Sequence, residues 1–534
     1  MPTISSSEES FLATLQHSLP SLLPEFLLRQ RWFGGKARTI RSVEVSDIIP
    51  FQLATLRSYF ILARVAYAAG PAEAYDIPLI HVPSESGGDS SWLRVRPHNR
   101  REEIALADAV TDQQFQTHLL DAIANGVSLT GMKGRIRTVS TGALPSLWQP
   151  SQGTLTPSVM NAEQSNSSVV YEKRLVLKIF RRVEEGLNPD LEIGAFLTEK
   201  SSFRNVPPLA GYLEYSDDAG PATSLGMLQG YIVNQGDAWQ LTLQALTEYY
   251  AKVPQWGSPA ESEVVHALLT VCRQAIPEEA RQRIGSYLDA AVLLGRRTAE
   301  LHLALASAQD DPNFAPQPFA QADQVALMNS GLQLLAANFD VLRRRIRDLP
   351  GRARLEADQV LLHEEDARRR FHSLDGLKTS AWVTRIHGDY HLGQVLSTGS
   401  DFVIVDFEGE PARPLEQRRK KRSPLQDVAG MLRSFHYAAY APLLQQANAE
   451  KMSQERLQTL TLWAQYWQLW VSAAFLKTYL EVSKSAIFIP KDREELALLL
   501  NLYLLDKAVY ELGYELNNRP AWVRIPLAGI SQLL

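Results

Sequence analysis

The chain has 534 residues, of which 45% are hydrophobic and 21% are charged, and its formal net charge is −5 at pH 7. This is the composition of a soluble globular protein, and the length predicts more than one domain. The negative charge argues against a nucleic-acid partner, because proteins that bind nucleic acids are usually basic. The single cysteine, Cys272, excludes a disulfide framework and a cysteine-based zinc site within one chain.

The N-terminal residues MPTISSSEESFLATL lack the basic start and apolar run of a signal peptide. The most apolar stretch near the other end, Leu496–Leu505, is too short to span a bilayer, which takes about 20 residues. We therefore expect a cytoplasmic protein without a membrane partner.

Residues 1–105 are predicted to form a small α+β subdomain. An aromatic and glycine-rich segment, RWFGGKAR, is followed by VEVSDII, SYFILARVAYAA and YDIPLIHV. These three runs are rich in branched and aromatic residues, which favours strands.

Residues 106–233 are predicted to form a second, β-rich region. The segment SSVVYEKRLVLKIF predicts two strands joined by a short turn at residues 172–174. The segment NPDLEIGAFLTEK predicts a helix, with Asn188 as its cap and Pro189 at its first position. The run SLGMLQGYIV predicts a further strand.

Residues 234–534 are dominated by long segments with helical periodicity. Trp463, Trp467 and Trp470 recur at helical spacing in one of them; such a row is typical of a core, and the alternative is a sugar-stacking wall. The fold class is therefore α+β, with a β-rich first half and a mostly helical second half. One β-like insertion, WVTRIHGDYHLGQVLSTGSDFVIVDFEGEP, interrupts the helices.

This insertion has the spacing of a phosphoryl-transfer site. Asp389 follows His387 and Gly388, Gln394 lies five residues beyond it, and Asp406 follows the strand-like run DFVIV. Protein kinases use the same distance from the aspartate of H-R-D-x-x-x-x-N to its amide, followed by D-F-G.

The residue types suit this chemistry. A carboxylate at Asp389 can aim an acceptor hydroxyl and take its proton. The amide oxygen of Gln394 and the carboxylate of Asp406 are hard ligands of the kind that Mg²⁺ prefers. A zinc pair at His387 and His391 is the weaker alternative, because no third ligand is evident.

The region before the insertion offers nucleotide-binding groups. Lys178 lies inside the apolar run LVLKIF, where burial of its charge calls for an anionic partner. A phosphate and Glu192 of the following helix are the predicted partners, as in the lysine–glutamate pair of kinases; a snorkelling edge-strand lysine is the alternative.

Phosphates and the adenine ring need further contacts. Ser165, Asn166 and Ser167 precede the lysine strand, where kinases carry a glycine-rich loop, and they offer hydroxyl, amide and backbone donors. A hinge that holds the adenine is expected at Gln229, Tyr231 and Val233.

The whole chain resembles bacterial maltokinases. The resemblance lies in RWFGGKAR, QSNSSVVYEKRLVLKIFRRVEEGLNPDLEIGAFLTE, IHGDYHLGQVL, VIVDFEGEP, SPLQDVAGMLRSF and YELNNRPAWVRIPLAGI. The HGDxHxxQ and DFEGEP segments mark the broader group of aminoglycoside-phosphotransferase-like kinases, whereas the first and last segments are more specific to maltokinases.

The resemblance implies a bilobal protein-kinase-like fold with an extra N-terminal cap subdomain and a helical C-lobe. It implies ATP and Mg²⁺ as cofactors, maltose as acceptor and maltose 1-phosphate as product, which feeds α-glucan synthesis. It also implies trehalose synthase as a partner. Carried onto this chain, it makes Asp389 the base, Gln394 and Asp406 metal ligands, and Lys178 with Glu192 the phosphate-holding pair.

Two other functions stay open. One is a kinase for glucosamine or another small sugar or aminoglycoside-like acceptor, for which Glu408 and Glu410 offer carboxylates to an ammonium group. The other is a pseudokinase scaffold for a trehalose-metabolising partner, which would have lost its base or metal ligands.

Overall fold

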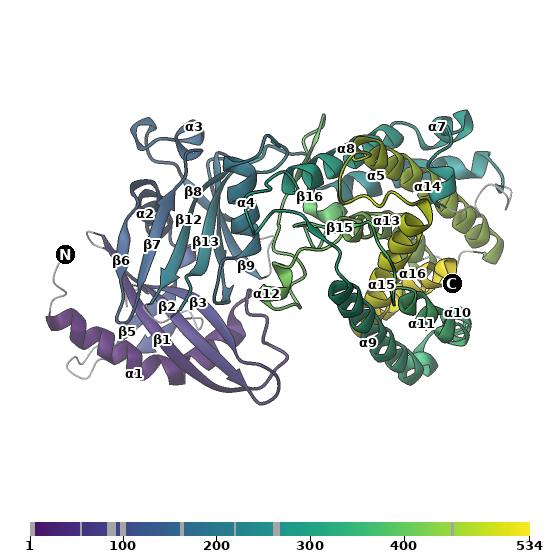
Figure 1. The fold of residues 1–534 in the computed structure, drawn as a ribbon. Coiled ribbons are helices and arrows are strands. Elements are labelled where there is room, and N and C mark those ends of the chain that lie inside the picture. Colours follow the sequence, from purple (N-terminus) through teal and green to yellow (C-terminus); the bar gives the residue numbers. More distant parts are fainter. Residues whose placement is uncertain are drawn as a thin grey trace. The chain divides into compact units, whose positions relative to one another are not determined.

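The structure is a computed structural model, and it describes residues 6–53, 56–82, 92–96, 103–160, 165–217, 220–259, 268–449 and 453–534. The chain forms two compact units (Figure 1). The sheet unit contains residues 1–200 and 207–233, and the helical unit contains residues 201–206 and 234–534.

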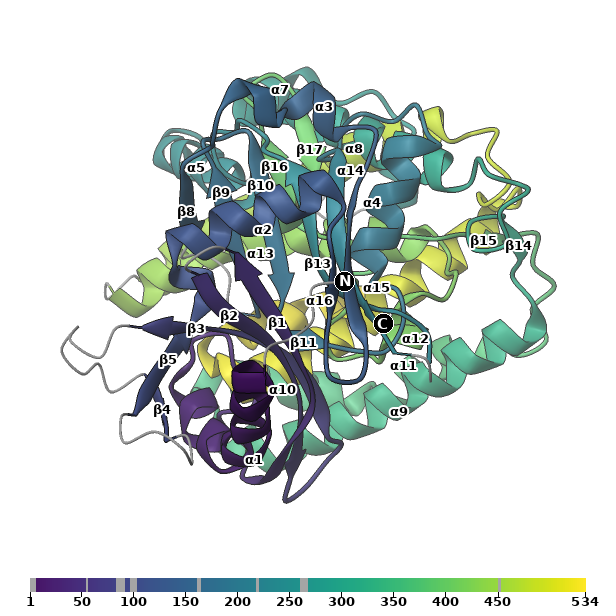
Figure 2. The ribbon, with the colours of Figure 1, turned by 90° about the vertical axis from the view of Figure 1, so that its left-hand side faces the viewer.

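The first sheet of the sheet unit is antiparallel and belongs to the N-terminal part of the chain. Its strand order is β1-β2-β3-β5-β4, and β11 pairs with β3 at Ala74 and Tyr75, a stretch of β3 that β5 does not cover. The helix α1 (Ser6–Arg29) packs against this sheet through leucines at helical spacing (Figure 2). The strands are β1 (Ile40–Leu53), β2 (Leu56–Tyr67), β3 (Glu73–Val82), β4 (Leu93–Val95), β5 (Ile104–Asp108) and β11 (Arg182–Val183).

The second sheet carries the predicted nucleotide-binding residues. Its order is β6-β7-β12-β13-β10-β9-β8, and every pairing is antiparallel. The strands are β6 (Ser128–Thr130), β7 (Arg135–Ser140), β8 (Pro157–Met160), β9 (Asn166–Tyr171), β10 (Leu175–Phe180), β12 (Leu209–Ser216) and β13 (Thr223–Gly230). The helices α2 (Gln113–Asn125), α3 (Leu144–Leu147) and α4 (Pro189–Glu199) complete the unit.

The two sheets share one hydrophobic core. Phe51 and Phe60 of the first sheet lie in the same buried cluster as Phe115 of α2 and Val169 and Leu177 of the second sheet. The side chains on the other face of the first sheet form a separate cluster with α1. The N-terminal sheet is therefore built into the sheet unit, because one of its faces is part of the common core.

Asp47 of β1 adds a polar connection between the sheets. Its buried carboxylate accepts hydrogen bonds from the backbone amides of Met132, Lys133 and Gly134, at 2.9, 3.1 and 2.8 Å. It also accepts from the hydroxyl of Tyr215 on β12 at 3.0 Å. These bonds satisfy the buried charge and hold the β6–β7 turn against the first sheet.

The local predictions for the second sheet are confirmed. β9 and β10 form the expected hairpin, whose turn residues Glu172 and Lys173 have φ of +46° and +55°, as a tight hairpin turn requires. Asn188 caps α4 by accepting from the amide of Asp190 at 2.8 Å, and Pro189 is the first residue of that helix.

The helical unit consists mainly of long helices. They are α5 (Ala238–Lys252), α6 (Leu268–Val271), α7 (Glu278–Ile284), α8 (Tyr287–Leu305), α9 (Gln321–Arg345), α10 (Gly351–Leu362), α11 (Glu364–His372), α12 (Leu415–Arg418), α13 (Leu425–Ala449), α14 (Gln454–Val482), α15 (Arg493–Asn518) and α16 (Arg524–Leu533). Trp463, Trp467 and Trp470 of α14 are buried, which confirms the core interpretation of that row.

One described helical segment, Gln321–Asp348, is long and apolar enough to cross a membrane by length and composition alone. One such helix is weak evidence, since the helices of soluble proteins also pass this test. In the structure, α9 buries Leu335, Phe339 and Leu342 along one side and packs against α11 and α15.

Candidate active site

The predicted catalytic loop lies between two short strands of the helical unit, β15 (Trp382–Val383) and β16 (Val395–Ser397). Asp427 of α13 holds its backbone. The amides of His387 and Gly388 donate to the two carboxylate oxygens of Asp427 at 2.8 and 2.9 Å. Gly388 has φ of +87°, a conformation that favours glycine. The backbone immediately before Asp389 is therefore fixed from α13.

Asp427 is itself supported inside the helical unit. His302 Nε2 of α8 lies 3.1 Å from Asp427 Oδ2, and His302 Nδ1 lies 3.0 Å from the hydroxyl of Tyr479. Burial opposes ionisation of Asp427, but His302, His387 and the Gly388 amide outweigh it and lower its pKa. An ionised, fully buried carboxylate thus anchors the loop through charge-assisted hydrogen bonds.

Two further residues of α13 contact the same loop. A Cβ atom at Gly430 would lie 2.5 Å from the carbonyl oxygen of Tyr390, so the close approach of helix and loop requires glycine. Ser434 Oγ accepts from the amide of Leu392 at 3.1 Å. Asp427, Gly430 and Ser434 are spaced by three and four residues and so share one face of the helix.

The predicted metal ligands Gln394 and Asp406 lie together. Gln394 directly precedes β16, which pairs with β17 (Phe402–Ile404) through Val395 and Ile404. Asp406 follows β17 at the same end of this hairpin, and the side-chain amide of Gln394 donates to Asp406 Oδ2 at 2.8 Å. Asp406 has φ of +67°, which turns the chain sharply after the strand.

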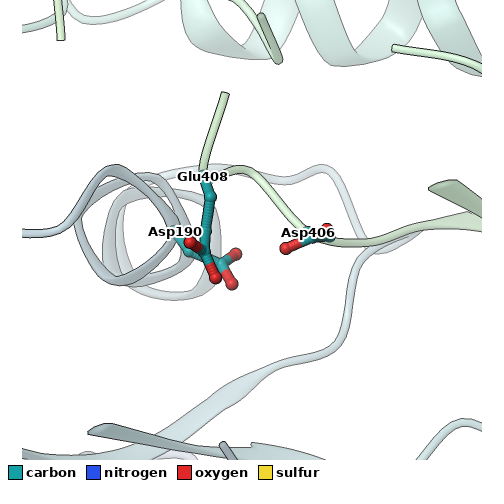
Figure 3. A group of neighbouring side chains, drawn as sticks. All are labelled: Asp190, Asp406 and Glu408. Carbon is teal, nitrogen blue, oxygen red and sulfur yellow. The ribbon is translucent and has the colours of Figure 1, made fainter. Parts of the chain in front are cut away.

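A further carboxylate, Glu408, was not predicted as a metal ligand. Asp406 and Glu408 both stand on the loop after β17 (Figure 3), and their nearest carboxylate oxygens lie within 4.8 Å of each other. His387 supports this loop from behind: its ring packs 4.9 Å from that of Phe407, and its Nε2 lies 3.0 Å from the carbonyl oxygen of Val405. The oxygen donors of Gln394, Asp406 and Glu408 fit a hard divalent cation.

Lys178 of β10 is buried in the sheet unit and has an acidic partner. Its ammonium donates to Asp190 Oδ2 at 2.9 Å, and Asp190 is also buried. The sequence pattern predicts Glu192, which is buried in the same first turn of α4. The sequence pattern did not predict Asp190 as a partner of Lys178. Asp190 lies two residues before Glu192 on α4 and is drawn in Figure 3.

The predicted phosphate-binding residues fall on two faces of β9. Ser168 pairs with Lys178 and Ser167 pairs with Ile179, so Ser168 shares the face of Lys178, whereas Ser167 points to the opposite face. Ser167 Oγ accepts from Arg181 Nε at 2.8 Å. Ser165 is exposed and Asn166 is buried at the start of β9. The hydroxyl of Ser167 is therefore a poor phosphate donor, contrary to expectation.

The predicted hinge leaves the end of β13. Gln229 pairs with Val176 and Leu209 within the sheet. The amide of Tyr231 donates to the carbonyl oxygen of Arg174 at 2.8 Å, so it is occupied within the sheet unit. The side chain of Val233 is 73% exposed.

A pocket of about 460 Å³ opens beside Asp389 in the helical unit. The catalytic loop, the segment after Glu408, and the helices α9, α13 and α15 form its wall. The lining residues are Ser330, Gln333, Leu334, Gly388, Asp389, Tyr390, Glu410, Ala412, Arg413, Pro414, Gln417, Gln426, Asp427, Gly430, Tyr503, Asp506, Lys507 and Tyr510. Its size, and its lining of apolar and aromatic side chains with several charged ones, are those of a small-molecule site.

The charges in this pocket are matched in pairs. Lys507 Nζ donates to Asp389 Oδ1 at 3.4 Å, and Arg413 donates to Glu410. Burial opposes the charge of Lys507, but Asp389, Glu511 and Glu410 outweigh it and raise its pKa. Lys507 was not predicted from the sequence; its only signal is a lysine within an apolar helical run.

Asp506 is the remaining carboxyl group of the pocket wall. Burial raises its pKa, while Arg413 acts in the opposite direction. Its neutral form is therefore favoured more than in an ordinary aspartate.

Comparisons with known proteins agree with this architecture. Residues 26–112 match the family described as the Maltokinase N-terminal cap domain. A glucosamine kinase of Streptacidiphilus jiangxiensis is 22% identical over 479 residues, covering 88% of this chain and 89% of the relative. A glucosamine kinase of Mycolicibacterium smegmatis is 24% identical over 389 residues, covering 70% of this chain and 79% of the relative.

Among solved structures, a glucosamine kinase in complex with glucosamine, ADP and inorganic phosphate superposes with a TM-score of 0.62 at 18% identity. It covers 98% of this chain and 99% of that chain. The chain therefore has the α+β kinase-like fold with an N-terminal cap. Its expected resemblance to maltokinase-like kinases is confirmed.

Proposed function

We propose that the chain is an ATP-dependent, magnesium-dependent kinase that phosphorylates maltose at its reducing-end hydroxyl, giving maltose 1-phosphate. The observation that carries this proposal is the pocket beside Asp389, in which Asp389 is paired with Lys507 and Glu410 is paired with Arg413. Such a balanced pocket suits a neutral polyhydroxylated acceptor.

In this function, Asp389 orients the acceptor hydroxyl and takes its proton. Lys507 Nζ, 3.4 Å from Asp389 Oδ1, would hold this carboxylate in place and supply a hydrogen-bond donor to the sugar. Gln394, Asp406 and Glu408 would hold Mg²⁺, which neutralises charge on the transferred phosphoryl group. A half-turn of the Gln394 amide presents its oxygen in place of the nitrogen that now faces Asp406.

The groups of the sheet unit are assigned to the nucleotide. Lys178, oriented by Asp190 and Glu192, would pair with phosphate oxygens. Ser165, just before β9, and Asn166 and Ser168, on that strand, would donate to the phosphates. Backbone groups near Gln229, Tyr231 and Val233 would hold the adenine.

The aromatic side of the pocket supports a disaccharide acceptor. Tyr503 and Tyr510 line it from α15, and Tyr514, one turn further along the helix, is exposed. Sugar rings stack on aromatic faces, so this row offers contacts to a second glucose unit beyond the reacting one. Trehalose synthase as a partner, α-glucan synthesis as the destination of the product and a cytoplasmic location belong to the same proposal.

Glucosamine is the second candidate acceptor. The two relatives reported above are called glucosamine kinases, and the carboxyl group of Asp506 in the pocket wall offers a partner to an ammonium group. A pseudokinase scaffold is not proposed, since Asp389, Gln394 and Asp406 are all present and the last two are in contact.

The test is ADP release from ATP and Mg²⁺ with maltose, glucose, glucosamine or trehalose, beside a reaction without metal. Maltose-dependent turnover that is lost without metal supports the proposal, and phosphorus–proton coupling at the anomeric carbon of the product identifies the hydroxyl. Turnover with glucosamine alone would overturn the assignment of maltose as the acceptor. In that case Asp506→Asn should raise KM for glucosamine at least tenfold, because a charge-assisted contact is lost.

A further inference from the structure

The strand that carries Lys178 continues into the N-terminal sheet. β10 ends at Phe180, Arg181 follows, and β11 begins at Arg182. β11 pairs with β3 of the first sheet, and the carbonyl oxygen of Arg181 accepts from the amide of Asp76 on β3 at 2.8 Å. Only three positions therefore separate Lys178 from a residue whose backbone is bound to the other sheet.

The side chain of Arg181 makes a second connection at the same point. It is only 1% exposed. Its Nε donates to Ser167 Oγ on β9 at 2.8 Å, and its Nη2 donates to both oxygens of Asp108, at 2.9 and 2.6 Å. The planar guanidinium group can bind both partners at once in a fixed geometry, which a lysine could not.

Trp32 contacts both Arg181 and Asp108. The guanidinium carbon of Arg181 lies 4.5 Å from the centre of the Trp32 ring, and the indole Nε1 donates to Asp108 Oδ2 at 3.1 Å. Trp32 and Asp108 both lie within residues 26–112, the part that matches the cap family. Four side chains thus connect the RWFGGKAR segment to the strand beside Lys178.

We propose that Arg181 is a positioning residue through which the cap sets nucleotide affinity. Trp32 and Asp108 bind the guanidinium group, and this group donates a hydrogen bond to Ser167, on the face of β9 opposite Lys178. On the opposite face of the same strand, the buried Ser168 pairs with Lys178. The inference rests on the proposed function in one respect, the use of the Lys178 face for nucleotide phosphates.

The experiment measures ADP affinity by calorimetry on the full chain, together with kcat and the KM values for ATP and sugar. The variants are Trp32→Phe, Asp108→Asn and Ser167→Ala, and the matched control is Ser140→Ala, an exposed serine of β7 in the same sheet. Each of the three should weaken ADP binding and raise KM for ATP about 3- to 10-fold, the size of one net hydrogen bond. The KM for the sugar should stay near the wild-type value.

A double-mutant comparison distinguishes an effect of Ser167 through Arg181 from a direct contact between Ser167 and the nucleotide. If Ser167 acts through Arg181, the double variant Trp32→Phe/Ser167→Ala should lose no more ADP affinity than the stronger single variant. The melting temperatures of Trp32→Phe and Asp108→Asn show whether both variants are folded. The proposal is overturned if Ser167→Ala weakens ADP binding while these two variants are folded and bind ADP with wild-type affinity. A wild-type chain that binds ADP but phosphorylates no sugar would refute the proposed function and leave this comparison intact.

Discussion

At the scale of single residues, Asp389 and Lys507 form the centre of the candidate site, since both line the pocket and their side chains are in contact. Asp389→Asn keeps the size of the side chain but removes the proton acceptor. We expect kcat to fall about 100-fold or more, with ADP affinity within twofold of wild type, as measured by steady-state kinetics and calorimetry. Asp358→Asn, an exposed aspartate on α10, is the control; equal turnover in both variants would remove Asp389 from the mechanism.

Asp76 is a second residue with a measurable signature. It is fully buried, and neither of its carboxylate oxygens has a hydrogen-bond partner among the described residues. Burial raises its pKa to about 8, with Arg181 opposing the shift and Asp108 adding to it. In the unfolded chain its pKa returns to about 3.9.

This shift makes stability depend on pH. Between about pH 4 and pH 8 the folded chain holds a proton that the unfolded chain has lost, so stability falls as pH rises through this window. Asp76→Asn is neutral throughout, and the melting temperature of the variant relative to wild type should therefore increase from pH 5 to pH 8. A difference that stays constant across these pH values would show that Asp76 does not titrate there.

At the scale of elements, α13 decides the shape of the catalytic loop. Gly430→Ala would place a methyl group 2.5 Å from the carbonyl oxygen of Tyr390, so helix and loop must separate. A displacement of about 1 Å near a reacting group can cost about 100-fold in rate, and we expect kcat to fall by 10- to 100-fold. Gly351→Ala at the start of α10 meets nothing within 4 Å and serves as the control. Wild-type kcat in Gly430→Ala would show that the loop tolerates the displacement.

The elements that the sequence predicts correctly are those that local patterns specify. The β9–β10 hairpin follows from alternation and a short turn, and Gln394 meets Asp406 because one short hairpin joins them. The position of Asp190 beside Lys178 depends on helical phase across 12 residues. Asp427 was missed because its partners lie far along the chain, 40 residues back at His387 and 125 residues back at His302.

At the scale of the whole molecule, the cap sheet is part of a shared core. Among the described residues up to 105, five apolar side chains lie in the cluster that also contains the second sheet, namely Ile49, Phe51, Phe60, Leu62 and Ile80. Each fully buried side chain of this kind contributes about 1.5–3 kcal/mol. Their sum is comparable to the total stability of a domain, which is about 5–15 kcal/mol.

Deletion of residues 1–105 should therefore unfold the sheet unit as well as remove the cap. We expect the truncated chain to lose ADP binding and the cooperative thermal transition of the sheet unit, as followed by calorimetry. A truncated chain that binds ADP with wild-type affinity would show that the second sheet folds independently, and it would also contradict the role assigned to Arg181.

The short segment 201–206 has a consequence for the order in which the protein is made. It belongs to the helical unit, where the carbonyl oxygen of Asn205 accepts from the amide of Ile404 and its side chain donates to the carbonyl oxygen of Phe402. Phe402 is synthesised 197 residues after Asn205. At about 5–20 residues per second, the ribosome exposes this segment for about 10–40 s before its partner strand exists. The nascent chain must therefore carry an unpaired stretch during this interval, which makes it a natural point for chaperone binding.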